Sequence, residues 1–533
     1  MALDQANENS TDTFSDRSGS WFKSLLLTDK IFVGLLVVSI IASALILGGT
    51  PHYVAEIIQM ATAALLLFAI LQSLITAHQL ALAVALRYLS IILLPLLAFI
   101  LFALFEMVPL PDWLVKNLSP AAYDFYFSAE VPAKSISLER AASTDSLLWI
   151  SVMLITFLWV IGLPRMDRTL KLWQPRQRRK VEERTLLVRA SQIDPLVNLL
   201  CSSIIFAALL CSVISIVHWS LHLDSLYGIW KVEDMWPRGK TRLHWPFVNP
   251  NHLACFLTMA FILSAERFLR LLQLLSMSFG EDMRIDSVLQ VMRNPQRLAL
   301  PLMYGAVCCL LAITNLLTLS RAGIALMLLG TIILYWTYAR FVSRAELSLE
   351  TRKRSYSWRV IMLLLGVVVV ASVLSQDQEK LLFDRLAYGL ASGYDEFRML
   401  LVQTAVGVIK DYWLVGVGLG CWPLVSMYYA PDKLAGLRLD YAHNDILQLL
   451  GEVGVIGLLL IAATMISLFA RGYGLWKKEI IFTQRLEIIG LFIAGLVPLI
   501  HGLVDFPLYL PAISLTWTIC LACLVRLLGE RQG

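Results

Sequence analysis

The chain has 533 residues, of which 58% are hydrophobic and only 16% are charged, and its mean hydropathy is +0.71. Soluble globular domains carry about 25% charged residues, so this composition excludes a soluble protein, a disordered chain and a fibrous repeat. The formal net charge of +5 is small, and its distribution is more informative than its total. We therefore expect an integral membrane protein.

Long apolar runs recur along the whole chain. A membrane-spanning helix needs about 20 mostly apolar residues, and twelve runs approach that length. They predict an all-α polytopic membrane protein with about 12 transmembrane helices. In chain order they cover residues 31–48, 54–73, 88–108, 146–163, 196–218, 253–270, 298–319, 322–339, 360–375, 445–470, 487–504 and 510–527.

The distribution of Lys and Arg predicts the orientation. If both termini are cytoplasmic, most of the 44 basic residues fall on the inner side, as the positive-inside rule requires. The basic loop 164–194 is then an inner topology anchor rather than a nucleic-acid site. The large outer loops are 109–145, 219–252 and 376–442. Because soluble nucleotides are absent outside, an enzyme working there needs a preactivated substrate such as a lipid-linked diphosphate.

Two arginines stand where charge is unfavourable. Arg321 begins a hairpin at the outer end of one span, and Arg398 lies on the apolar face of a predicted helix over 397–409. Either guanidinium suits an anionic headgroup or a phosphate. The structural alternatives are that Arg321 reaches lipid headgroups as a snorkelling side chain, and that Arg398 pairs with Asp395 or Glu396.

A third candidate directly precedes the apolar run 445–470. Asn444 is predicted to cap a helix there, and Asp445 in the first turn suits the positive end of the helix dipole. His443 lies just outside this helix, at the outer surface with Arg321, and has no evident structural duty. We therefore select His443 as a candidate catalytic residue.

The outer loop from Trp236 to His252 is basic and aromatic and contains no acidic residue. Guanidinium groups bind phosphate, and aromatic rings pack on sugars, so the loop suits a sugar diphosphate. The alternative is a rigid, Pro-rich turn within an interfacial aromatic belt. The candidate substrate-binding residues are Arg238, Arg242, Asn249, Asn251, His252 and, after the loop 376–442, Asn444.

Other signals are weaker. The glycines at 416, 418 and 420 do not form a dinucleotide fingerprint and predict a tight loop instead. No zinc-ligand spacing occurs, so we expect no metal, no cofactor and no nucleic-acid partner. His501 and Asp505 lie near the outer end of a late span, where they are either supporting partners of a site or a polar pair at a helix end.

Taken together, five segments resemble the O-antigen ligase and O-antigen polymerase family of membrane glycosyltransferases. The resemblance is strongest over about 240–470. The chain departs from the common pattern at Ala322, where a glycine often follows the arginine, and in the long basic loop 164–194. The segments are Phe247–His252, Leu319–Gly323, the Arg398 helix leading into Val415–Gly420, His443–Gln448 and Glu452–Gly457.

The resemblance implies a glycosyltransferase-C-like fold and a donor glycan carried on undecaprenyl diphosphate. In the family, arginines matching Arg321 and Arg398 engage the diphosphate, and a histidine matching His443 activates the acceptor hydroxyl. Such enzymes are regarded as metal-independent and inverting. The implied location is the bacterial inner membrane, with the active site facing the periplasm among membrane lipids. The implied acceptor is a glycan, lipid A-core or a protein.

These expectations divide the chain into four parts. They are a cytoplasmic tail (1–30), an N-terminal transmembrane bundle (31–240), a catalytic region including the outer loop 376–442 (241–470), and a C-terminal transmembrane hairpin (471–533). Polymerase, ligase and protein glycosylation remain open. A transporter or flippase, or a scaffold subunit for lipid-linked polysaccharide, is the alternative from another class. Transporters carry their charges near the membrane midplane, whereas the candidate charges here lie at one surface.

Overall fold

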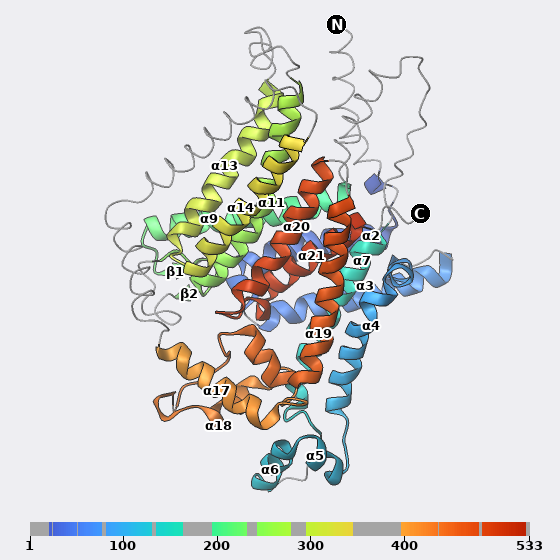
Figure 1. Ribbon diagram of the computed structural model, residues 1–533, viewed down its shortest axis with the longest axis vertical. Helices are drawn as coiled ribbons and strands as arrows, with labels where there is room; N and C mark the ends of the chain where they lie inside the picture. The colour runs from blue at the N-terminus through green and yellow to red at the C-terminus, as the bar shows by residue number, and fades with distance from the viewer. Residues whose placement is uncertain are drawn as a thin grey trace.

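The computed structural model is almost entirely helical (Figure 1). Within the described residues, the strands are β1 (Ser225–Leu226) and β2 (Trp230–Lys231), which pair as a short antiparallel hairpin. The all-α fold predicted from hydropathy is therefore confirmed. The structure describes residues 21–23, 25–50, 52–76, 81–130, 135–163, 194–231, 242–278, 295–344, 396–434, 436–478 and 482–528.

Eleven of the twelve predicted runs coincide with long helices, and the run 360–375 lies outside the described residues. Among the described residues, eight helices are long and apolar enough to cross a membrane, so the chain is a polytopic membrane protein. The long helices are α2 (Leu27–Leu45), α3 (His52–Thr76), α4 (Ala81–Met107), α7 (Arg140–Gly162), α9 (Pro195–Ser220), α11 (Pro250–Ser278), α13 (Pro295–Leu317), α14 (Arg321–Arg344), α19 (Asp445–Lys478), α20 (Phe482–His501) and α21 (Pro511–Leu528).

Short helices gather at one end of the bundle (Figure 1). They are α5 (Asp112–Leu118), α6 (Pro120–Ser128), α17 (Glu396–Tyr412) and α18 (Trp422–Tyr429), and the 3₁₀ turn η3 (Asp432–Leu434) packs on α17 through Leu434 and Leu401. The 3₁₀ turns η1 (Leu47–Gly49) and η4 (Pro507–Tyr509) lie elsewhere in the chain. Buried Val115 and Ala122 pack in one cluster with Ala405 and Trp422. Two segments predicted to be outer loops therefore lie together.

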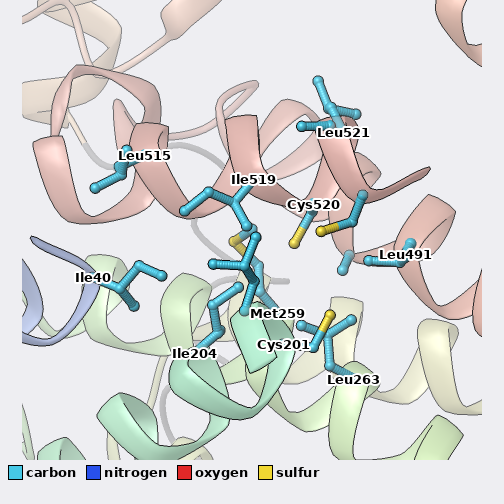
Figure 2. Close-up of a cluster of buried hydrophobic side chains, with 14 of the residues drawn as sticks. Ile40, Cys201, Ile204, Met259, Leu263, Leu491, Leu515, Ile519, Cys520 and Leu521 are labelled. Atoms are coloured by element: carbon cyan, nitrogen blue, oxygen red, sulfur yellow. The ribbon is translucent and has the colours of Figure 1, made fainter. Parts of the chain in front are cut away.

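The main core joins the first helices of the chain to the last two. Figure 2 shows Ile40 of α2, Ile204 of α9, Met259 of α11 and Ile519 of α21 converging in this cluster. Tight packing is what holds helices together in lipid, where solvent gives no hydrophobic drive for association. The core thereby fixes the beginning of α11 near the connection between α20 and α21.

The glycine-rich segment after α17 forms a tight loop, as predicted. Gly416, Gly418 and Gly420 all have positive φ angles, of 77°, 101° and 76°. The loop packs on the backbone of α19, where the Gly418 N–H donates to the Glu452 carbonyl at 2.9 Å. A Cβ at Gly416 would collide with that same carbonyl, so both the backbone conformation and the close approach require glycine.

Candidate functional site

His443 lies at the start of α19 in a left-handed backbone conformation, with φ of 52°. A non-glycine residue in such a region costs about 1–3 kcal/mol and persists where its surroundings hold it. The next residue supplies part of that support. Asn444 Oδ1 accepts from the N–H groups of Ile446 and Leu447 at 3.1 and 3.0 Å, so the predicted helix cap is confirmed. Its Nδ2 donates to the Leu503 carbonyl at 2.8 Å.

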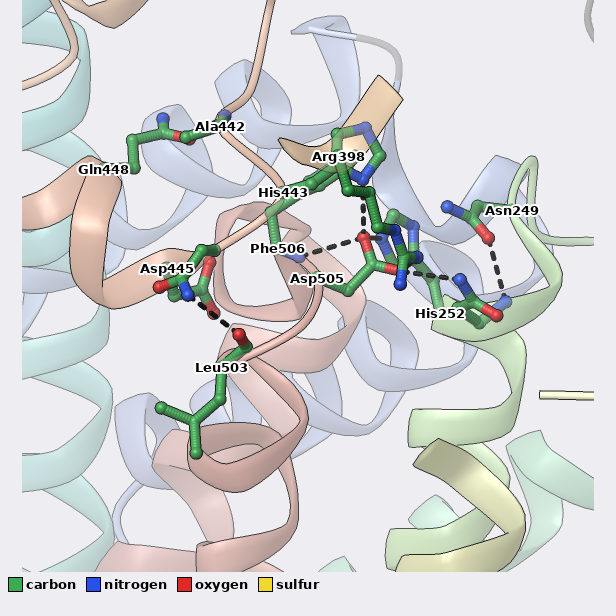
Figure 3. Close-up of polar contacts among 12 residues, drawn as sticks. Asn249, His252, Arg398, Ala442, His443, Asp445, Gln448, Leu503, Asp505 and Phe506 are labelled. Carbon is green, nitrogen blue, oxygen red and sulfur yellow. Dashed lines mark hydrogen bonds and ion pairs between the residues drawn. The ribbon is translucent and has the colours of Figure 1, made fainter. Parts of the chain in front are cut away.

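The His443 ring is held by Asp505, which lies between α20 and η4 (Figure 3). The distance from His443 Nδ1 to Asp505 Oδ1 is 3.1 Å. The same oxygen accepts from the Phe506 N–H at 3.1 Å and lies 3.5 Å from His252 Nε2. The Asp505 side chain is only 1% exposed, whereas that of His443 is 25% exposed. The Asp505 carboxylate is therefore buried, and the His443 ring lies between it and the protein surface.

The second carboxylate oxygen contacts two further candidate residues. Asn251 Nδ2 donates to Asp505 Oδ2 at 2.7 Å, and Arg398 Nη2 lies 3.8 Å from it. Asp505 thus joins the first turn of α11, the first turn of α17 and the segment before α19. The carboxylate that faces Arg398 is therefore that of Asp505, which is distant in sequence. Of the two neighbours considered as its partner, Asp395 lies outside the described residues.

The protonation of this cluster follows from its charges. Burial alone would raise the pKa of Asp505, but His252 and His443 beside it hold that pKa well below its usual range. Asp505 is therefore ionised at neutral pH and accepts hydrogen bonds on both oxygens. When His443 is neutral, its hydrogen lies on Nδ1 toward Asp505, and Nε2 keeps a lone pair that can take a proton.

Arg242 and Asn251 extend the cluster toward α14. Arg242 Nη2 donates to Asn251 Oδ1 at 3.0 Å, and its Nε donates to the Thr318 carbonyl at 2.7 Å. Thr318 lies three residues before Arg321, which is exposed and begins α14. Within the described residues, no contact joins Arg321 to Asp505. The hydrogen bonds from the site end at Thr318, three residues before Arg321.

Asn249 has a local structural contact. Its Oδ1 accepts from the Asn251 N–H at 2.9 Å, and its carbonyl accepts from the His252 N–H at 3.1 Å, so it caps α11. Pro250 at the first helical position suits such a start. His252, 3% exposed, points to Asp505 as described. Arg238 lies outside the described residues.

Aromatic rings enclose the two histidines. Phe506 stacks on Tyr441 with centroids 4.0 Å apart. The rings of His443 and His252 lie steeply inclined to the Phe506 ring, with centroids 4.7 and 4.5 Å from its centroid. Phe397, beside Arg398, lies 6.2 Å from the His443 ring. This frame restricts the rotation of both imidazoles, and it includes Tyr441 and Phe506, which the sequence did not single out.

The described residues contain no group of three or more His, Cys, Asp or Glu side chains that could hold a metal ion. The cluster offers a histidine oriented by a carboxylate, which suits proton transfer, beside a guanidinium able to bind an anion. Asp505 is the residue whose importance was underestimated from sequence. Its only local signal was its place beside His501 at a helix end.

Comparison with known proteins agrees with the resemblance. Residues 306–462 match the family model described as O-antigen ligase. A search of curated proteins finds no match. The matched range contains Arg321, Arg398 and His443 and omits Asn251, His252 and Asp505. With its many apolar helices, the chain is a multi-pass bacterial inner-membrane protein, and its residues 306–462 are similar to the O-antigen ligase family.

Proposed function

We propose that this membrane enzyme transfers a glycan from undecaprenyl diphosphate to an acceptor hydroxyl at the outer face of the inner membrane. The observation that carries the proposal is the 3.1 Å contact between His443 Nδ1 and the buried, ionised Asp505. A histidine held in this way resembles the base of a catalytic dyad. The family match supports a ligase or polymerase type of glycosyltransferase.

His443 acts as the general base. Its Nε2 removes the proton of the acceptor hydroxyl while the hydroxyl oxygen bonds to the anomeric carbon of the donor. The bond from that carbon to the diphosphate oxygen breaks, and undecaprenyl diphosphate leaves with the electron pair. Asp505 stabilises the imidazolium that forms.

Arg398 and Arg321 bind the diphosphate. The 3.8 Å separation of Arg398 from Asp505 is long for a hydrogen bond, so the guanidinium keeps donors for phosphate oxygens. Fixed positive charge stabilises the negative charge that develops on the leaving oxygen and takes the place of a divalent cation.

The remaining candidates are assigned to the walls of the site. Asn251 and His252 support Asp505 directly, Arg242 supports Asn251, and Asn249 and Asn444 fix the helix starts. Arg238 belongs to the same basic loop. The catalytic unit accordingly extends beyond 241–470 to Asp505 in the C-terminal hairpin. The glycan or lipid A-core acceptor binds on the exposed side of His443.

The test uses purified protein in liposomes with an undecaprenyl-diphosphate-linked oligosaccharide. His443→Ala is compared with wild type and with His222→Ala, which alters an exposed histidine outside the cluster. Glycan length on the lipid and released undecaprenyl diphosphate are measured. We expect the rate to fall about 10²–10⁴-fold in His443→Ala alone. Elongation identifies a polymerase, and release only after lipid A-core is added identifies a ligase. Movement of the lipid between leaflets without either reaction supports a transporter.

A further inference from the structure

A second network of buried polar residues lies behind His443, on the inward face of α19. Gln448 and Glu452 are one helical turn apart and are 1% and 0% exposed. Gln448 Nε2 donates to Glu452 Oε1 at 3.1 Å, and Tyr509 Oη donates to Glu452 Oε2 at 3.2 Å. None of these residues touches Asp505 in the contacts described above, so the network is separate from the first cluster.

The network ends on the backbone beside the catalytic histidine. Gln448 Oε1 accepts from the Ala442 N–H at 2.9 Å (Figure 3). Ala442 precedes His443, whose left-handed backbone conformation requires support from its surroundings. Asn444 provides that support after His443, and Gln448 provides it before. The histidine is thereby held on both sides along the chain.

At its other end the network is anchored to two neighbouring segments. The Glu452 carboxylate accepts from the backbone N–H groups of Gly420 and Trp422, which join the glycine-rich loop to α18. Through Tyr509 it reaches the aromatic frame, because the Tyr441 ring lies 5.7 Å from the Tyr509 ring. A buried carboxylate with donors from several directions forms a rigid support.

We infer that Gln448 and Glu452 are positioning residues that hold the segment Tyr441–His443 where the imidazole can take the acceptor proton. The inference rests on the proposed role of His443 as the base. The pair affects turnover by holding the backbone beside His443, because neither side chain reaches the Asp505 carboxylate or the exposed side of His443. A displacement of about 1 Å at a reacting group can lower a rate on the order of 10²-fold.

An exchange of the two side chains provides the sharpest test. Gln448→Glu alone places two carboxylates side by side in a buried site, which disrupts the network. In the double variant Gln448→Glu with Glu452→Gln, the carboxylate at position 448 accepts from the Ala442 N–H and from the amide at position 452. The amide oxygen at position 452 accepts from Tyr509. The bonds to the Ala442 N–H, between positions 448 and 452, and from Tyr509 are thereby restored in kind.

We expect Gln448→Leu and Gln448→Glu to lower kcat between about 10-fold and 100-fold with little change in the KM for the lipid-linked donor. The double exchange should recover most of kcat. Gln403→Leu, which alters an exposed glutamine on α17, should leave kcat unchanged. All variants are assayed in liposomes after size-exclusion chromatography confirms that they are folded.

The outcomes separate this inference from the proposed function. A wild-type kcat in Gln448→Leu, or a double exchange no more active than Gln448→Glu, overturns the positioning role. If Gln448→Leu does not fold, Gln448→Glu and the double exchange still decide the question. Wild-type turnover in His443→Ala overturns the proposed function instead, whatever the Gln448 variants do.

Discussion

The Asp505 carboxylate contacts side chains from three separate segments of the chain, and an ionised group so deeply buried is tolerated only with such partners. An amide at this position has one accepting atom and one donating group. Asp505→Asn therefore turns a donor toward either His443 and the Phe506 N–H, or Asn251 and Arg398.

We expect Asp505→Asn to lower the transfer rate about 10²–10⁴-fold, because the base loses its orientation. The rate of release of undecaprenyl diphosphate measures the effect. Asp432→Asn, at an exposed aspartate in η3, provides the matched control. Equal rates in the two variants would remove Asp505 from the mechanism.

The lowered pKa of Asp505 also predicts a pH dependence of stability. A carboxyl whose pKa is lower in the folded state stabilises the fold fully above its unfolded pKa of about 3.9, and the stabilisation disappears as the pH falls through the folded value. The difference in melting temperature between wild type and Asp505→Asn should be constant above about pH 5 and shrink below about pH 4. Thermal unfolding in detergent over this range measures it. A difference that widens on acidification contradicts the assignment.

Arg398→Lys tests recognition of the diphosphate. An ammonium does not reproduce the planar fork of a guanidinium, and the loss of one charge-assisted hydrogen bond costs about 1.5–3 kcal/mol, or roughly 10-fold to 100-fold in rate. We expect kcat/KM for the lipid-linked donor to fall by that factor. Arg438→Lys is the control, because Arg438 is exposed in the same outer segment. Unchanged kinetics in Arg398→Lys would place the phosphates elsewhere.

At the scale of elements, the ends of three helices meet at one buried ion pair. Asp194 caps α9 through the N–H groups of Leu196 and Val197. Arg526 of α21 donates from Nε to Asp194 Oδ2 at 2.8 Å. Its Nη1 donates to the carbonyls of Val160 and Leu163 at the end of α7. One guanidinium therefore satisfies both a buried acid and the last carbonyls of a helix.

Arg526→Met should destabilise the protein by about 3–5 kcal/mol, because it leaves Asp194 buried without its partner. The double variant with Asp194→Asn should regain part of that loss. Thermal unfolding of the purified variants in detergent provides the measurement. Equal melting temperatures for Arg526→Met and wild type would show that the pair contributes nothing to stability.

The helices and their caps could be predicted from the sequence because they depend on residues that are close together in the chain. Eleven of the twelve predicted apolar runs coincide with described helices, and the Asn444 cap depends on residues two and three positions away. The role of Asp505 was not accessible in the same way. Its partner His443 lies 62 residues earlier, and Asn251 lies 254 residues earlier. The fold alone brings them together, so the sequence supplied the candidate residues without their arrangement.

For the whole molecule, we propose that the Asp505 cluster faces the periplasm and that both termini are cytoplasmic. Helix α19 (34 residues) is interrupted at Gly454, which has non-helical backbone angles. At about 1.5 Å per residue, the part over 455–478 is by itself long enough to cross a hydrocarbon core of about 30 Å. The first residue of α19 adjoins the cluster. Arg471, near its other end, is therefore expected on the cytoplasmic side.

Cysteine labelling tests this orientation. In a Cys309→Ser background, which removes an exposed native thiol, Leu437→Cys should react with a membrane-impermeant maleimide on intact spheroplasts. Arg471→Cys should react only after the membrane is permeabilised. Leu437 is 51% exposed, so access to it does not limit the reaction. The reverse pattern would invert the proposed topology.

Asp505 lies beyond the end of the stretch that matches the family model, which stops at residue 462. A chimaera that exchanges only that stretch with a relative would therefore carry a histidine from one parent and its carboxylate from the other. Truncation before the last two helices would leave the matched stretch intact and remove the carboxylate altogether. In hybrid enzymes built to change glycan specificity, the matched stretch, the start of α11 and the C-terminal hairpin should accordingly come from the same parent.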